Sequence, residues 1–318
     1  MALTGTMHRA ASLTSRITVV TGLSRRRRSL KSGEYPPGSL FRRLRDALFL
    51  VIFLASVVAG MGVLGALLVD VLRDGLGWLD FQFLNSYPSR RAAESGIKAA
   101  LFGTLWIMGL TALFTVPLGI AAAIYLVEFA SNNRINRLIQ LNISNLAGVP
   151  SIIYGLLGLA IFVQFFAMGR SVLVGALTMT LLILPIVIIA AQEAIRAVPS
   201  EFKDAAFAMG ANRWQVVKTI VLPHAAPGIL SGIILALSRA IGEAAPMITI
   251  SSLVFLTFIP DGIGSRFTVM PIQIFTWVSL PQPEFESVAS AGIIVLLILL
   301  LSMNSIAIYL RNKFQKRV

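Results

Sequence analysis

Two oppositely charged residues stand four positions apart in one of the most apolar stretches of this chain, the segment LSRAIGEAAPM at Leu237–Met247. On a helix, residues i and i+4 lie on one face, about 6 Å apart along the axis, so Arg239 and Glu243 can pair. A lone charge at the centre of a bilayer costs at least about 2.5 kcal/mol. A guanidinium stays charged and presents planar donors that match the oxygen atoms of an anion. The pair therefore predicts an anion site, or a self-neutralised brace between helices.

Two neighbours of the pair extend this candidate pathway. Pro246 has no amide hydrogen, so within a continuous helix it would leave the carbonyl of Gly242 without a partner. That carbonyl would add a polar group beside the two charges. The candidate substrate pathway thus consists of Arg239, Gly242, Glu243 and Pro246.

The composition indicates a membrane protein. Of 318 residues, 56% are hydrophobic and 13% are charged, whereas soluble domains carry about 25% charged residues. The absence of cysteine excludes disulfides, thiolate nucleophiles and Cys-ligated zinc, and the two distant histidines, His8 and His224, do not suggest a metal site. The net charge of +13 would suit nucleic acid, but in so apolar a chain basic residues set the membrane orientation. We expect no nucleic-acid partner.

The elements that must position the charge pair are transmembrane helices. An apolar run of roughly 20 residues crosses a bilayer, and its backbone must satisfy its own hydrogen bonds there, so each span is a helix. We therefore predict an all-α, polytopic membrane protein. The six predicted spans are 47–71, 98–127, 138–166, 171–195, 228–258 and 288–310.

The distribution of Lys and Arg predicts the orientation of these spans. With a cytoplasmic N-terminus, twenty of the 27 Lys and Arg residues fall in inside segments and six in outside segments, and Arg239 is the remaining one. Cytoplasmic loops carry the excess of positive charge, so we expect both termini inside. The predicted organisation is a basic cytoplasmic segment at 1–46, a transmembrane domain at 47–310 and a basic cytoplasmic tail at 311–318.

The glycines of the first span match the dinucleotide-binding pattern G-x-G-x-x-G at Gly60–Gly65. That pattern binds a dinucleotide only between a strand and a helix. Within a membrane span, small residues let helices approach closely, so we predict helix packing at these positions.

The segment 199–227 is too long for a simple turn and carries its own helix signals. A short helix at its start is stopped by Gly210, as a glycine at a helix C-terminus commonly does. Asn212 can cap a second helix, which the Leu222-Pro223 pair would end. We expect two short helices that form a knob on the cytoplasmic side.

The spacing in this knob resembles the EAA loop of ABC-importer permeases, which seats in a groove of a separate ATPase subunit. The motif is D-A-A-x-x-x-G at 204–210, followed after nine residues by I-x-L-P at 220–223. Asp204 stands where the family usually has glutamate, so the acidic group is kept but is one methylene shorter. By this resemblance, the coupling loop is 199–223, and its contacts to the ATPase would be Asp204, Ala205, Ala206 and Gly210.

Other segments resemble one branch of that family, the PstA permeases of phosphate-specific importers. They are RAIGEAAP at 239–246, where Ala244 replaces the usual threonine, LAGVPSIIYGLLGLAIFV at 146–163 and MPIQIFTWVSLPQPEF at 270–285. The resemblance implies an ABC importer permease fold with a cytoplasmic coupling-helix loop, and a permease for inorganic phosphate. Sulfate and molybdate permeases share a looser form of the pattern, so another oxyanion stays open, as does a membrane scaffold without transport.

The same resemblance implies the partners and the location. These are a second, PstC-like permease, two ATPase subunits on the cytoplasmic side, an external phosphate-binding protein and the lipid bilayer of the bacterial cytoplasmic (inner) membrane. No G-x-x-x-x-G-K-[ST] loop occurs in the chain, so it lacks the P-loop that cradles ATP phosphates. We expect no enzymatic activity and no cofactor in this chain, with Mg-ATP bound by the partner ATPase.

For a phosphate substrate, the residues leave two roles open for Glu243. Phosphate at neutral pH still carries a proton, which a carboxylate can accept, whereas fully ionised sulfate would meet repulsion. In the second role, Glu243 only neutralises Arg239 while the pathway is empty.

Overall fold

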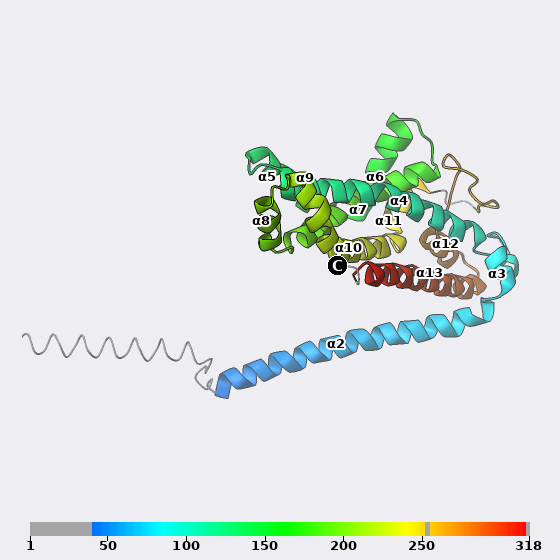
Figure 1. Ribbon diagram of the computed structural model, residues 1–318. Coiled ribbons are helices and arrows are strands. Elements are labelled where there is room, and N and C mark those ends of the chain that lie inside the picture. The colour runs from blue at the N-terminus through cyan, green and yellow to red at the C-terminus, as the bar shows by residue number, and fades with distance from the viewer. Residues whose placement is uncertain (1–39, 252–254, 316–318) are drawn as a thin grey trace, which may run out of the picture. The chain divides into compact units, whose positions relative to one another are not determined.

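The computed structural model describes residues 40–251 and 255–315, and this part of the chain is built from helices and loops without a strand (Figure 1). The all-α prediction is confirmed for these residues. The chain divides into two compact units, one ending at Leu67 and the other covering Leu68–Val318. Parts of three predicted segments lie outside the described residues: 1–39 of the basic N-terminal segment, 252–254 of the fifth span and 316–318 of the tail.

The first unit consists, in its described part, of the N-terminal portion of α2 (Leu40–Gly75), a helix that contains the predicted first span. Every side chain from Leu44 to Asp70 is exposed, although the helix is strongly apolar. Apolar surface of this extent requires lipid or another protein around it. The pattern at Gly60–Gly65 is helical throughout, so it lacks the strand that a dinucleotide site needs. Its packing against another helix stays a prediction.

Four long helices dominate the second unit: α4 (Lys98–Ile124), α7 (Val172–Arg196), α10 (Leu222–Ile241) and α13 (Glu284–Gln315). The shorter helices and turns that connect them are η1 (Leu76–Trp78), α3 (Phe81–Asn85), η2 (Ala92–Glu94), η3 (Tyr125–Phe129), α5 (Arg134–Leu146), α6 (Ser151–Gly158), η4 (Leu159–Phe165), α8 (Ser200–Ala208), α9 (Arg213–Val216), η5 (Val217–Val221), α11 (Ala245–Ile250) and α12 (Met270–Val278). The π-helical turns η3, η4 and η5 directly follow α4, α6 and α9.

α7 is the most buried of the long helices, and α4 and α10 pack along it. Small residues permit this close packing. A Cβ added at Gly228 of α10 would lie 2.8 Å from the Cβ of Ala194, and one added at Gly119 of α4 would lie 2.7 Å from a methyl carbon of Val187. Helix α13 covers α10 (Figure 1). The core that supports the candidate site is therefore formed by α4, α7 and α10.

Five helices in the described residues are long and apolar enough to cross a membrane, and a sixth candidate is a helix pair bent by 105°. Three predicted spans coincide closely with observed helices: 98–127, 171–195 and 288–310. Two predicted spans are wrong as continuous helices. The third, 138–166, is broken between α5 and α6, and the helix of the fifth, 228–258, ends at Ile241.

The break in the predicted third span has its cause in Pro150. Proline lacks an amide hydrogen and disfavours a helical conformation in the residue before it, so α5 ends at Leu146 and α6 begins at Ser151. The hydroxyl of Tyr154 donates to the carbonyl of Leu146 at 2.7 Å. This bond satisfies one of the acceptors left free at the end of α5.

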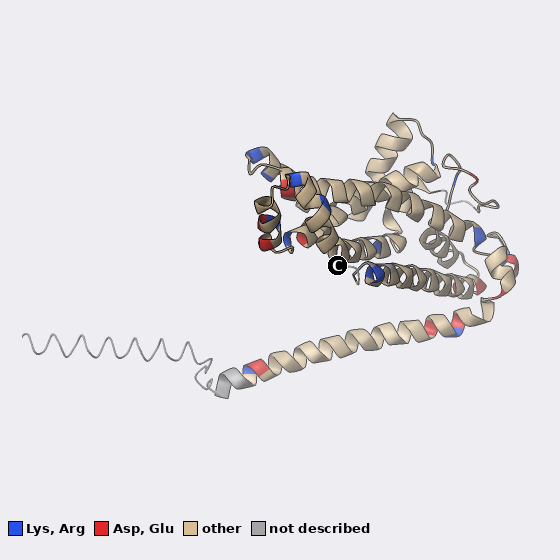
Figure 2. Cartoon of the chain, in the orientation of Figure 1, with Lys and Arg blue, Asp and Glu red and all other residues tan. Residues whose placement is uncertain are grey.

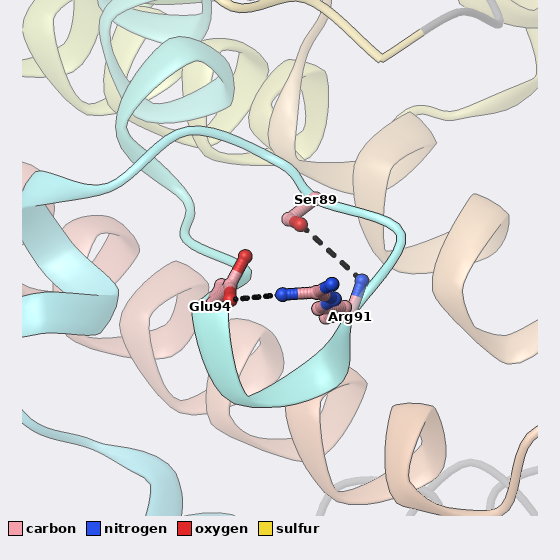
Figure 3. A network of polar contacts seen from close by, with 3 residues as sticks. All are labelled: Ser89, Arg91 and Glu94. Atoms are coloured by element: carbon pink, nitrogen blue, oxygen red, sulfur yellow. Dashed lines mark hydrogen bonds and ion pairs between the residues drawn. The ribbon is translucent and has the colours of Figure 1, made fainter.

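Polar contacts order the segment between α2 and α4. The carboxylate of Asp80 caps α3 and accepts the amide of Phe83 at 2.7 Å. Figure 3 shows Nη1 of Arg91, 3.0 Å from Oε1 of Glu94, and the Arg91 amide, which donates to Oγ of Ser89 at 3.2 Å. In the second unit, charged residues gather mainly around α3 at one end of the helix bundle and around α5, α8 and α9 at the other (Figure 2). The layer between these ends is largely apolar, as a membrane span requires.

Candidate functional site

The predicted ion pair forms at the end of α10. Nε of Arg239 lies 3.1 Å from Oε1 of Glu243. The helix ends at Ile241, and the next two amides bond three residues back: that of Gly242 to the carbonyl of Arg239, and that of Glu243 to the carbonyl of Ala240, both at 3.2 Å. The pair therefore closes across a helix end. This corrects the expectation that it lies within a continuous helix.

Gly242 and Pro246 bracket the interruption. Gly242 is the C-terminal cap of α10, and Pro246 stands in the first turn of α11, where a proline needs no amide hydrogen. The continuous helix is therefore wrong, but in the described residues the carbonyl of Gly242 has no hydrogen-bond partner, as predicted, because it lies at a helix end. Inside a helix, glycine is about 1 kcal/mol and proline about 3 kcal/mol less favourable than alanine. Ending the helix before Gly242 and restarting it at Ala245 avoids both penalties.

The two members of the pair differ in exposure. The side chain of Arg239 is 56% exposed in this chain and that of Glu243 is 18% exposed. Within the described residues, neither terminal guanidinium nitrogen of Arg239 has a hydrogen-bond partner. Two parallel N–H donors on a permanently charged group suit the oxygen atoms of an oxyanion. In the same residues, no three His, Asp or Glu side chains gather as a metal site would require.

Glu243 lines a narrow cavity between α4, α7, α10 and α11. Its volume is about 10 Å³, roughly the space of one water molecule. Thr104, Ile107 and Met108 of α4 form one wall. The Thr104 hydroxyl accepts the amide of Met270 at 2.9 Å and donates to a carbonyl of its own helix at 2.8 Å. The wall that faces Glu243 is therefore fixed to the start of α12.

Beyond the break, α11 packs on α6. A Cβ added at Gly155 would lie 2.7 Å from Cα of Pro246 and 2.6 Å from Oγ1 of Thr249. Only glycine permits this backbone distance, because real Cβ atoms do not approach other atoms so closely. α6 itself starts after the break at Pro150. The charge pair thus lies beside the point where two proline-interrupted spans meet.

The predicted coupling loop turns sharply at Gly210. Its φ is +85°, a left-handed conformation that glycine adopts without steric strain. The amide of Gly210 donates to the carbonyl of Phe207 at 2.9 Å, and the amide of Ala211 donates to that of Ala206 at 3.1 Å. This pair of bonds is a Schellman motif, which closes a helix C-terminus. The predicted stop of the first short helix at Gly210 is confirmed.

Asn212 begins the second helix as predicted. Its side chain accepts the amide of Gln215 at 2.9 Å, and the Gln215 side chain accepts the amide of Asn212 at 2.8 Å, which forms a capping box. The predicted end at Leu222-Pro223 is wrong, because one helical run extends from Arg213 to Ile241. Proline is tolerated here since it follows the wide π-helical turn η5 in the first turn of α10. A single helix, about 40 Å long at 1.5 Å per residue, thus joins the loop to the charge pair.

Three of the four predicted coupling residues lie on the surface of the loop: Asp204, Ala205 and Gly210. Ala206 is 3% exposed and packs in the main core. It therefore helps to position α8, and its predicted contact with the ATPase stays a prediction. The structure keeps the loop and the charge pair apart, at the two ends of the same helical run.

The loop also exposes large apolar side chains that the sequence analysis did not single out. Phe207, Met209 and Trp214 are exposed, Met209 by 83%. Apolar side chains on a protruding loop favour contact with another protein. Their position next to the glycine of a recognised loop was the available signal in the sequence.

The sequence matches the family described as "Binding-protein-dependent transport system inner membrane component" over residues 115–317, a region that contains both candidate sites. It is 33% identical over 291 residues to the probable ABC transporter permease protein YqgI of Bacillus subtilis (strain 168), covering 87% of this chain and 98% of that protein. It is 32% identical over 254 residues to phosphate transport system permease protein PstA 1 of Mycobacterium tuberculosis (strain ATCC 25618 / H37Rv), covering 78% of this chain and 81% of that protein.

Two solved transporters share the architecture. A chain of a bacterial alginate ABC transporter, solved in complex with an alginate pentasaccharide-bound periplasmic protein, has a TM-score of 0.63 at 16% identity and covers 85% of this chain and 96% of that one. A chain of the MetNI methionine ABC transporter in an inward-facing conformation has a TM-score of 0.54 at 16% identity and covers 69% of this chain and 94% of that one. At such identities the likeness concerns the fold alone, and it confirms the predicted importer permease fold.

Proposed function

Because this chain belongs to the family of binding-protein-dependent transport system inner membrane components, we propose that it is the PstA-type permease subunit of an ATP-driven importer of inorganic phosphate. The observation that carries the proposal is the Arg239–Glu243 pair at a helix break, with two guanidinium nitrogens of Arg239 unbonded in the described chain. The likeness to permeases named for phosphate transport supports the choice of anion.

Arg239 supplies the donors for the passing anion. Two phosphate oxygens accept its terminal N–H groups, while Nε stays bonded to Glu243. The carboxylate neutralises the guanidinium while the pathway is empty, so the anion does not meet an uncompensated positive charge. Binding of intermediate strength suits a pathway, since the substrate must enter and also leave.

The role of Glu243 also affects how the permease would discriminate between phosphate and sulfate. In the geometry of the pair, Oε1 is occupied by Nε of Arg239, and this favours the role of neutraliser and holder of the guanidinium over that of proton acceptor. Phosphate and sulfate then differ little at this residue. Discrimination between them would come mainly from the external binding protein.

Coupling to ATP is assigned to the loop at 199–223. Asp204, Ala205 and Gly210, with the exposed Phe207 and Met209 beside them, would seat in an ATPase subunit that binds Mg-ATP. This chain would then hydrolyse no ATP itself. A second, PstC-like permease would complete the pathway, two ATPase subunits would dock inside, and an external phosphate-binding protein would deliver the substrate.

The assembly would reside in the bacterial cytoplasmic (inner) membrane with both termini in the cytoplasm. Because the chain contains no cysteine, a single introduced cysteine is the only thiol of this chain, and labelling is read on the purified permease. An impermeant maleimide applied to intact cells should label Asn85→Cys, Gly169→Cys and Gly264→Cys. It should leave Ala208→Cys unlabelled until the membrane is permeabilised, and labelling of Ala208→Cys in intact cells would reverse the proposed orientation.

The function itself is tested by co-expression with candidate ATPase and permease subunits, followed by uptake into proteoliposomes in the presence of the binding protein. ATP-dependent accumulation of phosphate, in excess over sulfate and molybdate, is the expected result. Preferred uptake of sulfate or molybdate would assign the permease to another oxyanion. A fully assembled complex without uptake of any of the three would favour a membrane scaffold.

A further inference from the structure

A second ion pair links α8, the first helix of the coupling loop and here called the coupling helix, to another part of the bundle. Nζ of Lys203 in α8 lies 2.6 Å from Oε1 of Glu128 in η3, and the two side chains are 19% and 15% exposed. In the part of the chain that the structure describes, every other ion pair joins residues no more than four positions apart. Lys203 and Glu128 are 75 positions apart, so their contact is purely tertiary.

The contact is short, charge-assisted and largely withdrawn from water. Such bonds are stronger than neutral ones, and removal of one partner leaves a largely buried charge uncompensated. The two side chains therefore hold α8 against η3 more firmly than an exposed pair would.

The other contacts of α8 connect it to the helical run that follows it. Ala206 packs in the core, and the ring of Phe202 lies 5.1 Å from that of His224 in α10. The backbone of α8 packs mainly on α9 and η5. Lys203 is thus the side chain that attaches the coupling helix to α4 by a polar bond.

Glu128 stands where α4 ends in a π-helical turn. The amide of Ala130 donates to the carbonyl of Tyr125 at 2.8 Å, a bond that reaches five residues back. Such wide turns often occur at functional positions in helices. The turn places Glu128 beside α8 and joins it to the long helix α4.

At its other end, α4 forms the wall of the cavity that Glu243 lines. Thr104 and Ile107 belong to this wall, and Thr104 precedes Glu128 by 24 positions, which is about 36 Å along a helix. Both positions belong to one continuous helical run, Lys98–Phe129, which contains Pro117 and packs along α7. A displacement of its inner end is therefore felt at the charge pair.

We infer that Glu128 and Lys203 are positioning residues that couple the two ends of this permease: their ion pair carries movement of the coupling helix into α4 and so to the cavity wall beside Glu243. The inference rests on the proposed transport function and deepens it. The helical run from Arg213 to Ile241 already connects the coupling loop to the charge pair, and the ion pair provides a second connection through α4. The pair makes α8 move α4 and α10 together.

The test measures anion uptake per ATP hydrolysed by the reconstituted complex. Glu128→Gln and Lys203→Gln should assemble and hydrolyse ATP but lose about tenfold in uptake per ATP, since one side of the coupling contact is missing. The double charge exchange, Glu128→Lys with Lys203→Glu, should recover most of that loss. The matched control is Glu193→Gln, which breaks the exposed pair of Glu193 with Arg196 and should leave uptake per ATP unchanged.

Normal uptake per ATP in both single variants would overturn the inference, as would a charge exchange that assembles without recovery. Should a single neutral variant fail to assemble, Glu128→Asp replaces it, because this change keeps the charge and withdraws it by one methylene. A lower uptake per ATP at normal assembly is then expected, and an unchanged ratio contradicts the inference. The wild-type complex is first assayed with phosphate, sulfate and molybdate, so a failure of the phosphate proposal is detected separately. Uptake per ATP is then measured with the anion that the wild-type complex transports.

Discussion

The Arg239–Glu243 pair joins residues four positions apart at a helix end, whereas the Glu128–Lys203 pair joins a π-helical turn to a helix 75 positions later. In the first pair Arg239 is mostly exposed and Glu243 is largely buried, whereas both members of the second pair are largely buried. Exposed ion pairs contribute about 0–1 kcal/mol, because water competes for each partner. Breaking a buried pair by removal of one partner costs about 3–5 kcal/mol.

This difference suits the two ion pairs to two different roles in one permease. In the proposed cycle, Arg239 exchanges part of its hydration for a passing anion, and a weak pair permits that exchange. Glu128 and Lys203 stay together through the cycle, and a strong pair permits the transmission of movement. The following variants should break or sharpen this contrast, and uptake by each is compared at equal amounts of this permease in the membrane.

The largest effect is expected for Arg239→Gln. The amide keeps most of the side-chain length but removes the fixed charge, so uptake should fall to the background of liposomes without ATP. Arg239→Lys should be impaired as well, because a point charge cannot reproduce the planar fork. The control is Arg170→Gln, which removes an exposed arginine elsewhere. Unchanged uptake by Arg239→Gln would reduce the pair to a structural brace.

Gly210→Val should abolish most of the uptake by disturbing α8, which carries Lys203. A β-branched side chain resists the φ of +85°, and the left-handed conformation costs about 1–2 kcal/mol for a residue with a Cβ. Recovery of the ATPase in a pull-down should fall in parallel. Gly210→Asn is the matched control, because asparagine tolerates this conformation. Equal uptake and equal ATPase recovery in the two variants would mean that the backbone angle at Gly210 does not determine the conformation of the loop.

Glu243→Gln should slow uptake by about tenfold, the equivalent of about 1.4 kcal/mol. The amide oxygen can still accept Nε of Arg239, but the neutralising charge is lost, so the anion binds more tightly and leaves more slowly. Affinity and rate are measured with phosphate and sulfate side by side. The preference between them should not change, and loss of discrimination against sulfate would instead assign Glu243 the role of proton acceptor.

The smallest effect is expected for Gly155→Ala. The new Cβ would meet Pro246 and Thr249 at 2.6–2.7 Å, and relief of such overlap costs about 1–3 kcal/mol. The shift of α11 should lower the unfolding temperature and reduce uptake a few-fold, while uptake per ATP in the Glu128–Lys203 assay stays normal. Gly148→Ala is the control, since its nearest contact would be an ordinary 3.5 Å. Identical stability of the two variants would contradict the close packing of α6 and α11.

Much of the fold and of the charge pair could be predicted from the sequence, because the rules that govern them act over a few residues. A bilayer forces apolar spans into helices, and the spacing of Arg239 and Glu243 places them within reach of each other. The stop at Gly210 and the cap at Asn212 depend on neighbours within five positions. Each of these features was confirmed where the structure describes it.

The two broken spans show where such rules fail although a signal was present. Pro150 and Pro246 were visible, but apolar residues continue past both of them. Hydropathy reflects the free energy of transferring side chains into lipid, and it does not depend on whether the backbone continues as one helix. The predicted continuous helices were therefore wrong at the two positions that bring α6 and α11 together.

Only the tertiary structure decided which side chains of the coupling loop face outward and what holds the loop. Ala205 is exposed and its neighbour Ala206 is buried, because the rotation of α8 is set by its packing on α9 and η5. The contact of Lys203 with Glu128 depends on how every helix between them packs. The sequence by itself determined the local helices, turns and the spacing of the charge pair, whereas a contact across 75 positions follows from the sum of many weak packing terms that no local pattern encodes.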